Sequence, residues 1–180
     1  MAVNFWRDAA KGGLIIGAVV VAVSYIKAWL AMSGSSVGAL FTLVELAAVV
    51  YCIYRFSKER SLLYDSAAGY SYGQNMGFVV AMMLLAGFIY GVGYYFLVNH
   101  VAPGFGETMA EASAQAAVVM YGDQGEAMLG MLDTMMANPF FWIFYGVTAM
   151  IIYGGLIGLF VSAFVKRRPD IFANNTPRNE

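Results

Sequence analysis

Two ionisable side chains, Lys27 and Glu45, lie in stretches of sequence that are otherwise apolar. Charges in such surroundings are costly, so they usually pair with one another or serve a function. The polar turn at residues 33–36 separates the two stretches and predicts an antiparallel hairpin. At a rise of 1.5 Å per residue the two side chains differ in depth by about 4–5 Å, which a lysine side chain can cover. We therefore expect an ion pair in the half of the hairpin nearest its turn.

This pair has a functional and a structural interpretation. Functionally, it could relay protons or ions, or hold the polar group of a ligand. Structurally, it could fix the register of the hairpin, or Lys27 could reach the interface while Glu45 faces another helix. Transporters usually carry several such pairs and broken helices near the membrane midplane, and neither is clear in this sequence. Both interpretations remain open.

Glycine spacing is the second pattern. The chain has 20 glycines, and Gly-x-x-x-Gly pairs fall within three of its apolar stretches. Small residues at this spacing let helix backbones approach closely, either within one chain or against a second copy or partner. The pairs are Gly13 and Gly17, Gly87 and Gly91, and Gly154 and Gly158.

Other residues that could carry chemistry are few. Cys52 and His100 are the single residues of their types, which excludes an internal disulfide and a multi-histidine metal or haem site. The phenols of Tyr90 and Tyr153 lie deep in later apolar stretches, need hydrogen-bond partners and could line a site for a lipid or sugar. Hydrolase, zinc-protease and nucleotide-binding motifs are missing from the sequence. We expect no catalytic residue, no metal site and no cofactor.

The composition identifies the class of protein. Of 180 residues, 61% are hydrophobic and 12% are charged, against about 45–50% and about 25% in soluble domains. A soluble domain of this size cannot bury so much apolar surface, so we expect an integral membrane protein. Disordered chains, nucleic-acid modules and secreted disulfide scaffolds are excluded.

Four apolar stretches are long enough to cross about 30 Å of hydrocarbon as helices. They cover residues 12–30, 37–54, 76–98 and 140–165, and they predict an all-α four-helix membrane bundle formed by a single domain, residues 1–180. Residues 1–11 could form a short interfacial helix or extend the first span. Residues 99–139 form an insertion, and residues 166–180 form a tail.

Charge distribution sets the expected orientation. The insertion at residues 99–139 holds five acids and no Lys or Arg, whereas nine of the ten basic residues fall in the other non-spanning segments. The positive-inside rule therefore places both termini in the cytoplasm and the insertion outside. The nine basic residues are Arg7, Lys11, Arg55, Lys58, Arg60, Lys166, Arg167, Arg168 and Arg178.

The insertion predicts two short helices at the outer membrane surface. Residues 107–121 are rich in alanine, and residues 128–136 repeat apolar side chains at helical spacing. Gly122 and Gly125 separate the two segments. Asn138 and Pro139 suit the start of the fourth span, as its cap and first residue.

A candidate cytoplasmic docking surface precedes the third span. Residues 69–74 read Gly-Tyr-Ser-Tyr-Gly-Gln, in which tyrosines suit the interface and glycine allows a helix or lipid headgroup to approach the backbone. An ordinary start to the third helix is the other interpretation. The residues of this surface are Arg55, Lys58, Arg60, Tyr70, Tyr72 and Gly73.

The order of these features resembles an uncharacterised family of small bacterial membrane proteins, domain of unknown function 4199. The resemblance begins at residues 5–8, Phe-Trp-Arg-Asp, is clearest at residues 69–74, and closes with Asn138, Pro139 and the fourth span. It implies a Bacteroidota-type source and the cytoplasmic membrane, and it supplies no activity. It also implies that the gene lies beside a gene for a glycosyltransferase of the polyprenyl-phosphate sugar synthase type.

We therefore expect a non-enzymatic inner-membrane protein, an accessory or scaffold subunit of an envelope-building complex such as a polyprenyl-phosphate glycosyltransferase. The alternative is a small transporter or channel-like protein that uses Lys27 and Glu45. A membrane enzyme would need a polar cavity lined by several titratable groups. The expected partners are membrane lipid and either a protein, such as a membrane-associated glycosyltransferase, or a second copy of the chain, but not nucleic acid.

Overall fold

The computed structural model describes residues 4–34, 37–65, 67–122 and 134–170. Four described helices are long and apolar enough to cross a membrane, which confirms the prediction of an all-α, multi-pass membrane protein. These are α1 (Phe5–Met32), α2 (Gly38–Leu62), α3 (Tyr72–Phe96) with its π-helical continuation η1 (Leu97–Val101), and α6 (Pro139–Val165). A further helix, α4 (Pro103–Tyr121), follows η1.

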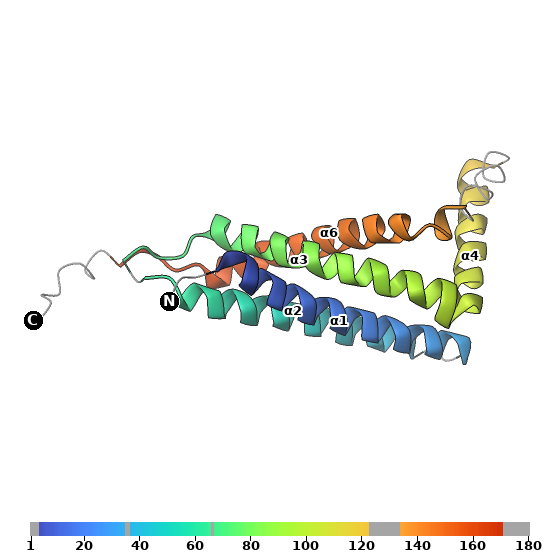
Figure 1. Cartoon of the computed structure of the whole chain (residues 1–180), viewed down its shortest axis with the longest axis horizontal. Helices are drawn as coiled ribbons and strands as arrows, with labels where there is room; N and C mark the ends of the chain where they lie inside the picture. The colour runs from blue at the N-terminus through green and yellow to red at the C-terminus, as the bar shows by residue number, and fades with distance from the viewer. Residues whose placement is uncertain (1–3, 35–36, 66, 123–133, 171–180) are drawn as a thin grey trace, which may run out of the picture.

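The four long helices run side by side as an antiparallel bundle, and α4 lies across one end of it (Figure 1). The start of α1 and the last residues of α6 lie at the opposite end of the bundle. Helix α3 is central because it packs along both α6 and α1, whereas α2 contacts mainly α1 and α6. One end of the bundle is covered by α4, and we call it the α4 end. At the other end, α1 and α3 begin and α2 and α6 finish, and we call this the basic end.

The helices extend past the predicted spans at several boundaries. Helix α1 begins at Phe5, where the Asn4 side chain accepts a hydrogen bond from Arg7 N, so residues 5–11 extend the first span. Helix α2 continues to Leu62, well beyond the apolar stretch. Helix α3 begins at Tyr72 because Ser71 and Gln74 form a reciprocal capping box. Apolar composition marks the hydrocarbon-crossing part of a helix and does not mark its ends.

The insertion agrees in part with the expected pattern. Helix α4 starts at Pro103, earlier than predicted, and ends at Tyr121; Gly122 follows as its cap, with a φ of +58° that suits glycine. Asn138 caps α6 as expected, since its Oδ1 accepts a 2.9 Å hydrogen bond from Phe140 N, and Pro139 opens the helix. The second predicted helix, residues 128–136, and Gly125 fall mostly outside the described residues, of which 134–136 are helical.

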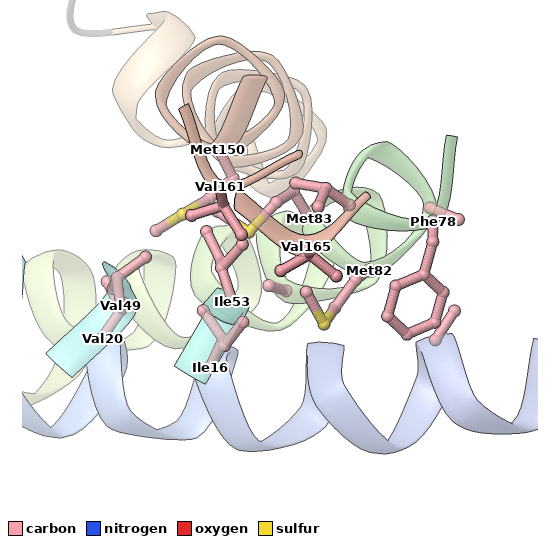
Figure 2. Close-up of a cluster of buried hydrophobic side chains, with 14 of the residues drawn as sticks. Ile16, Val20, Val49, Ile53, Phe78, Met82, Met83, Met150, Val161 and Val165 are labelled. Atoms are coloured by element: carbon pink, nitrogen blue, oxygen red, sulfur yellow. The ribbon is translucent and has the colours of Figure 1, made fainter. Parts of the chain in front are cut away.

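The core joins all four spanning helices. Buried side chains from each helix interlock, with methionines from α3 and α6 between branched residues from α1 and α2 (Figure 2). Methionine fills irregular gaps between helices because its side chain is unbranched and flexible. The outer faces are also apolar, as the exposed Phe144, Phe160 and Phe164 of α6 illustrate, which suits contact with lipid.

Glycines bring α1 and α6 against α3. A Cβ atom on Gly13 would lie 2.6 Å from the Met82 carbonyl oxygen of α3, and one on Gly17 would lie 3.0 Å from that of Ala86. On the other side of α3, a Cβ on Gly91 would lie 2.5 Å from the Trp142 carbonyl oxygen of α6. These pairs therefore pack within one chain, which is one of the two alternatives predicted from their spacing.

The α3–α6 contact is reciprocal. Gly87 of α3 lies against Gly146 of α6, so that a Cβ on either would come within 2.7 Å of the other's carbonyl oxygen. Gly154 packs against Met83, and Gly158 packs against Met76 and Val79. Gly146 belongs to no pair singled out from the sequence, and its partner lies far away along the chain.

Substitution of Gly91 by alanine tests this contact. We expect Gly91→Ala to lower the free energy of unfolding by about 1–3 kcal/mol, because the new methyl group would meet backbone that cannot move aside. Gly77→Ala is the matched control on the same helix, since a Cβ there meets nothing within 4 Å. Unfolding in mixed micelles, followed by circular dichroism, measures both changes. Equal stability of the two variants would show that α3 and α6 do not require this approach.

Candidate functional site

The structure brings Lys27 and Glu45 together across the α1–α2 hairpin. Lys27 Nζ donates a hydrogen bond to Glu45 Oε2 over 3.2 Å. The Lys27 side chain is 33% exposed and the Glu45 side chain is 16% exposed, so the pair is open on one side. Both residues lie nearer the α4 end than the basic end, as the short hairpin turn requires.

A cavity of about 250 Å³ opens beside this ion pair. Helices α1, α2, α3 and α6 all contribute to its wall, which includes the two charged side chains, one threonine and three tyrosines. Its polar lining residues are Lys27, Thr42, Glu45, Tyr90, Tyr145 and Tyr153. The two tyrosines singled out as deep in the sequence, Tyr90 and Tyr153, thus share a cavity with the ion pair.

Helical spacing could have identified some of these neighbours. Thr42 precedes Glu45 by three residues and lies on the same face of α2. Tyr145 and Tyr153 are eight residues apart on α6, which also places them on one face. Thr42 was not among the predicted site residues, and spacing alone does not reveal that these faces of α2 and α6 meet. The resulting site holds one positive charge, one negative charge and several hydroxyls, so it can bind a polar group of balanced charge.

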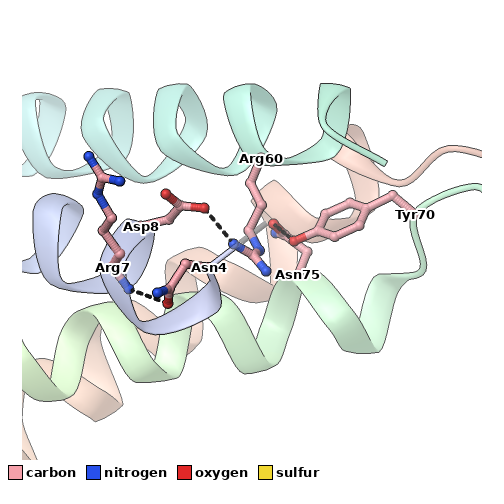
Figure 3. Close-up of polar contacts among 6 residues, drawn as sticks. All are labelled: Asn4, Arg7, Asp8, Arg60, Tyr70 and Asn75. Atoms are coloured by element: carbon pink, nitrogen blue, oxygen red, sulfur yellow. Dashed lines mark hydrogen bonds and ion pairs between the residues drawn. The ribbon is translucent and has the colours of Figure 1, made fainter. Parts of the chain in front are cut away.

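Arg60, by contrast, is part of a buried cluster at the basic end (Figure 3). Its side chain is 4% exposed, and its Nη1 donates a 2.8 Å hydrogen bond to Asp8 Oδ2 of α1. The guanidinium also lies 4.9 Å from the ring centres of Phe5 and Phe78, a geometry of favourable cation–π contact. The prediction that Arg60 forms an exposed docking surface was wrong, because α2 continues far enough to carry this side chain between α1 and α3.

Tyr70 is a second correction, since it is 1% exposed. Its hydroxyl donates to Asn75 Oδ1 over 3.3 Å, and Asn75 Nδ2 donates to Ser162 Oγ over 2.8 Å, which links the loop before α3 to α6. Figure 3 shows the Tyr70 ring directed at Asn75, with Arg60 nearby. Burial raises the pKa of Tyr70 to about 12, although the Arg60 charge opposes this shift.

The segment after α6 is hydrogen-bonded to the loop before α3. Tyr70 and Arg167 exchange two backbone hydrogen bonds of 2.9 Å in an antiparallel β-bridge. Gly69, at φ +68°, permits this approach, because a Cβ there would lie 2.8 Å from the Arg167 carbonyl oxygen. Arg167 Nη1 also donates to the Ser61 carbonyl oxygen over 3.0 Å, so Arg167 stabilises the C-terminal end of α2.

The other predicted docking residues are exposed. Arg55 pairs with Glu59 across one turn of α2 at 2.9 Å, and Lys58 is exposed on the same helix. Tyr72 is 39% exposed and donates a hydrogen bond to the Leu159 carbonyl oxygen, while Gly73 borders open space. Further exposed basic residues of the basic end are Arg7, Lys11, Lys166 and Arg168; Arg178 lies outside the described residues.

His100, the single histidine, lies in η1 near the α4 end of the bundle. Its ring packs against Tyr95 and Phe96 at centroid distances of 5.6 and 5.4 Å. Within the described ranges, no three His, Cys, Asp or Glu side chains gather as metal ligands would.

Comparison with known proteins gives one match. A family model described as "Protein of unknown function (DUF4199)" matches residues 11–167, from the first turns of α1 to the residue that forms the β-bridge. Neither the curated proteins nor the solved structures contain a match to the chain.

The raised pKa of Tyr70 predicts a particular loss of stability in alkali. The folded protein favours the neutral phenol, so this stabilisation is complete below the ordinary pKa of 10 and is lost as the pH rises through about 12. We expect Tyr70→Phe to cost about 1 kcal/mol at neutral pH, because Asn75 loses a donor.

The same variant should then lose less stability than the wild type between pH 10 and 12. Melting temperatures in detergent across this range measure the difference. Gly77→Ala, which removes no titratable group and places its Cβ in open space, is the control and should keep the wild-type pH dependence. A Tyr70→Phe profile parallel to that of the wild type would contradict the assignment.

Proposed function

The chain belongs to the family described as Protein of unknown function (DUF4199), and within that family we propose a scaffolding role for it. In this proposal it is a non-enzymatic, multi-pass protein of the bacterial inner membrane and an accessory subunit of an envelope-building complex. Its basic end faces the cytoplasm, where it holds a phosphate-bearing polyprenyl lipid or an acidic face of a membrane-associated glycosyltransferase.

The observation that supports this role is the gathering of exposed positive charge at one end of the bundle. The basic end carries exposed Lys and Arg side chains on α1, on α2 and after α6. The described part of the α4 end carries Glu107 and Glu111 on α4, and no Lys or Arg is described beyond Lys27 toward that end. Basic residues beside a membrane gain about 1 kcal/mol each from anionic headgroups. The same asymmetry favours cytoplasmic termini.

The rigidity of the basic end also supports a docking role. The Arg60–Asp8 pair joins α2 to α1, the Asn75–Ser162 hydrogen bond joins α3 to α6, and the β-bridge at Tyr70 fixes the segment after α6. A surface that is already ordered loses little conformational entropy when a partner binds. The buried residues thus hold the exposed basic residues in fixed positions.

The transporter alternative is favoured by one observation, the cavity beside Lys27 and Glu45. Alternating-access transporters usually bind substrates where helices break near the midplane. The described spanning helices α1, α2 and α6 are continuous, and the π-helical η1 lies at the α4 end of α3. This continuity supports the scaffold as the first choice.

Purification from the native host in gentle detergent, with mass spectrometry of bound proteins, tests the scaffold. We expect a membrane-associated glycosyltransferase in stoichiometric amount. The charge-reversed variant Lys58→Glu with Arg168→Glu should retain less than about a tenth of the bound glycosyltransferase, because charge pairs at an interface contribute strongly to affinity. Glu107→Lys with Glu111→Lys, a charge reversal of equal size and opposite sign at the α4 end, should retain the glycosyltransferase. Recovery of the chain alone, or with further copies of itself, would contradict the proposal.

A paired substitution separates the scaffold from the transporter. Lys27→Leu with Glu45→Leu removes both charges together and leaves no unpaired ion in the membrane. We expect the variant to fold and still bring down the partner, because the basic end is untouched. An unchanged melting temperature together with loss of the cellular function would instead favour transport through the cavity.

A further inference from the structure

The cavity beside Lys27 and Glu45 has features of a ligand site that the scaffolding role does not use. Its volume of about 250 Å³ suits a small headgroup. Among the described residues, Lys27 Nζ donates one hydrogen bond, to Glu45, and therefore keeps N–H donors for a ligand. The 33% exposure of the Lys27 side chain leaves that ammonium accessible from one side.

The depth of the cavity matches the headgroup boundary of a bilayer. Lys27 lies five residues before the last residue of α1, which corresponds to about 8 Å of helix. The 28 residues of α1 span about 42 Å, which exceeds a hydrocarbon layer of about 30 Å by roughly 6 Å at each end. The ion pair therefore lies only a few ångströms inside the hydrocarbon, within reach of a lipid headgroup in the leaflet at the α4 end.

The charges restrict the ligand class. A simple anion or cation would add net charge to a neutral ion pair at membrane depth, which is costly. A zwitterion adds none, since its anionic group can bind Lys27 while its cationic group binds Glu45. The rings of Tyr145 and Tyr153 can contact the ligand's cation through their faces, and the tyrosine and Thr42 hydroxyls can bond to ester and phosphate oxygens.

We propose that this cavity binds a zwitterion that carries a phosphate and a primary ammonium, as the phosphoethanolamine headgroup of a membrane lipid or as the free headgroup. Lys27 binds the phosphate, and Glu45 accepts hydrogen bonds from the ammonium. Binding opens the 3.2 Å contact between the two side chains and replaces it with two contacts to the ligand. This site is independent of the scaffolding role, because it lies near the α4 end and not at the basic end.

Native mass spectrometry of the purified full chain in detergent tests the proposal. The probes share dioleoyl tails and differ in headgroup: phosphatidylethanolamine, phosphatidylcholine, phosphatidylglycerol and monoglucosyl diacylglycerol. We expect phosphatidylethanolamine to bind at least about tenfold more tightly than phosphatidylglycerol or the glucolipid, because phosphatidylglycerol has no ammonium for Glu45 and the glucolipid has neither charged group. Tighter binding of phosphatidylcholine, which has no ammonium N–H, or of the glucolipid would overturn the assignment.

Variants connect this preference to the cavity. Lys27→Gln with Glu45→Gln keeps polar side chains of similar length and should abolish the preference. Arg55→Gln with Glu59→Gln removes an exposed ion pair outside the cavity and should keep it. Tyr153→Phe, which leaves both charges in place, should weaken phosphatidylethanolamine binding about fivefold. This variant tests the site even if the double glutamine variant does not fold. A preference retained in both cavity variants would overturn the proposal.

Soluble glycerophosphoethanolamine distinguishes the two sources of the headgroup. If it competes only weakly with the lipid, the ligand is the membrane lipid, as the depth of the cavity favours. Competition at equal concentration would confirm the zwitterion and assign a water-soluble source. Preferential binding of phosphatidylglycerol would contradict the chemistry for either source.

Discussion

The close approach of helix backbones at α3 is the constraint on which the bundle depends. In lipid, helices gain little from the hydrophobic effect, so van der Waals packing must hold them together. Gly13 and Gly17 allow the backbones of α1 and α3 to approach closely, and Gly87, Gly91 and Gly146 do the same for α3 and α6. Helix α2 has a glycine only at its first position, Gly38, and makes few contacts with α3. The room for an internal cavity is therefore found where α2 stands apart from α3, beside the ion pair.

The polar groups of the bundle fall into two classes of different purpose. At the basic end, Arg60, Tyr70 and Asn75 are buried and hydrogen-bonded, Arg60 to Asp8 and Tyr70 to Asn75, and Asp8 alone is partly exposed. Beside the cavity, Lys27 and Glu45 satisfy one another and remain open to a ligand. The Arg60 guanidinium lies against two aromatic rings and contributes to structure, whereas the Lys27 ammonium borders the larger cavity and can exchange its partner.

Sequence alone predicts the four spans and the hairpin pairing of Lys27 with Glu45, because continuous apolar stretches and a short turn leave few other arrangements. It also predicts the cap at Asn138. The burial of Arg60 and Tyr70 was not predictable, since both lie in polar sequence that would normally face water. Their burial depends on α2 running past the apolar stretch and on the segment after α6 pairing with the loop before α3, and both depend on contacts between residues far apart in the chain. The meeting of Glu45 with Tyr145 and Tyr153 likewise requires the α2–α6 interface.

The β-bridge between Tyr70 and Arg167 has a consequence for biogenesis. Arg167 follows α6, so the ribosome adds it after all four described spanning helices have been synthesised. Until then, the Tyr70 backbone lacks its Arg167 partner, and the Ser61 carbonyl oxygen lacks the Arg167 guanidinium. The bridge can therefore form only after the last helix has been inserted. In a chain that is released early, or whose last helix fails to enter the membrane, the loop before α3 stays unpaired. A membrane quality-control protease could distinguish such a chain by the accessible loop.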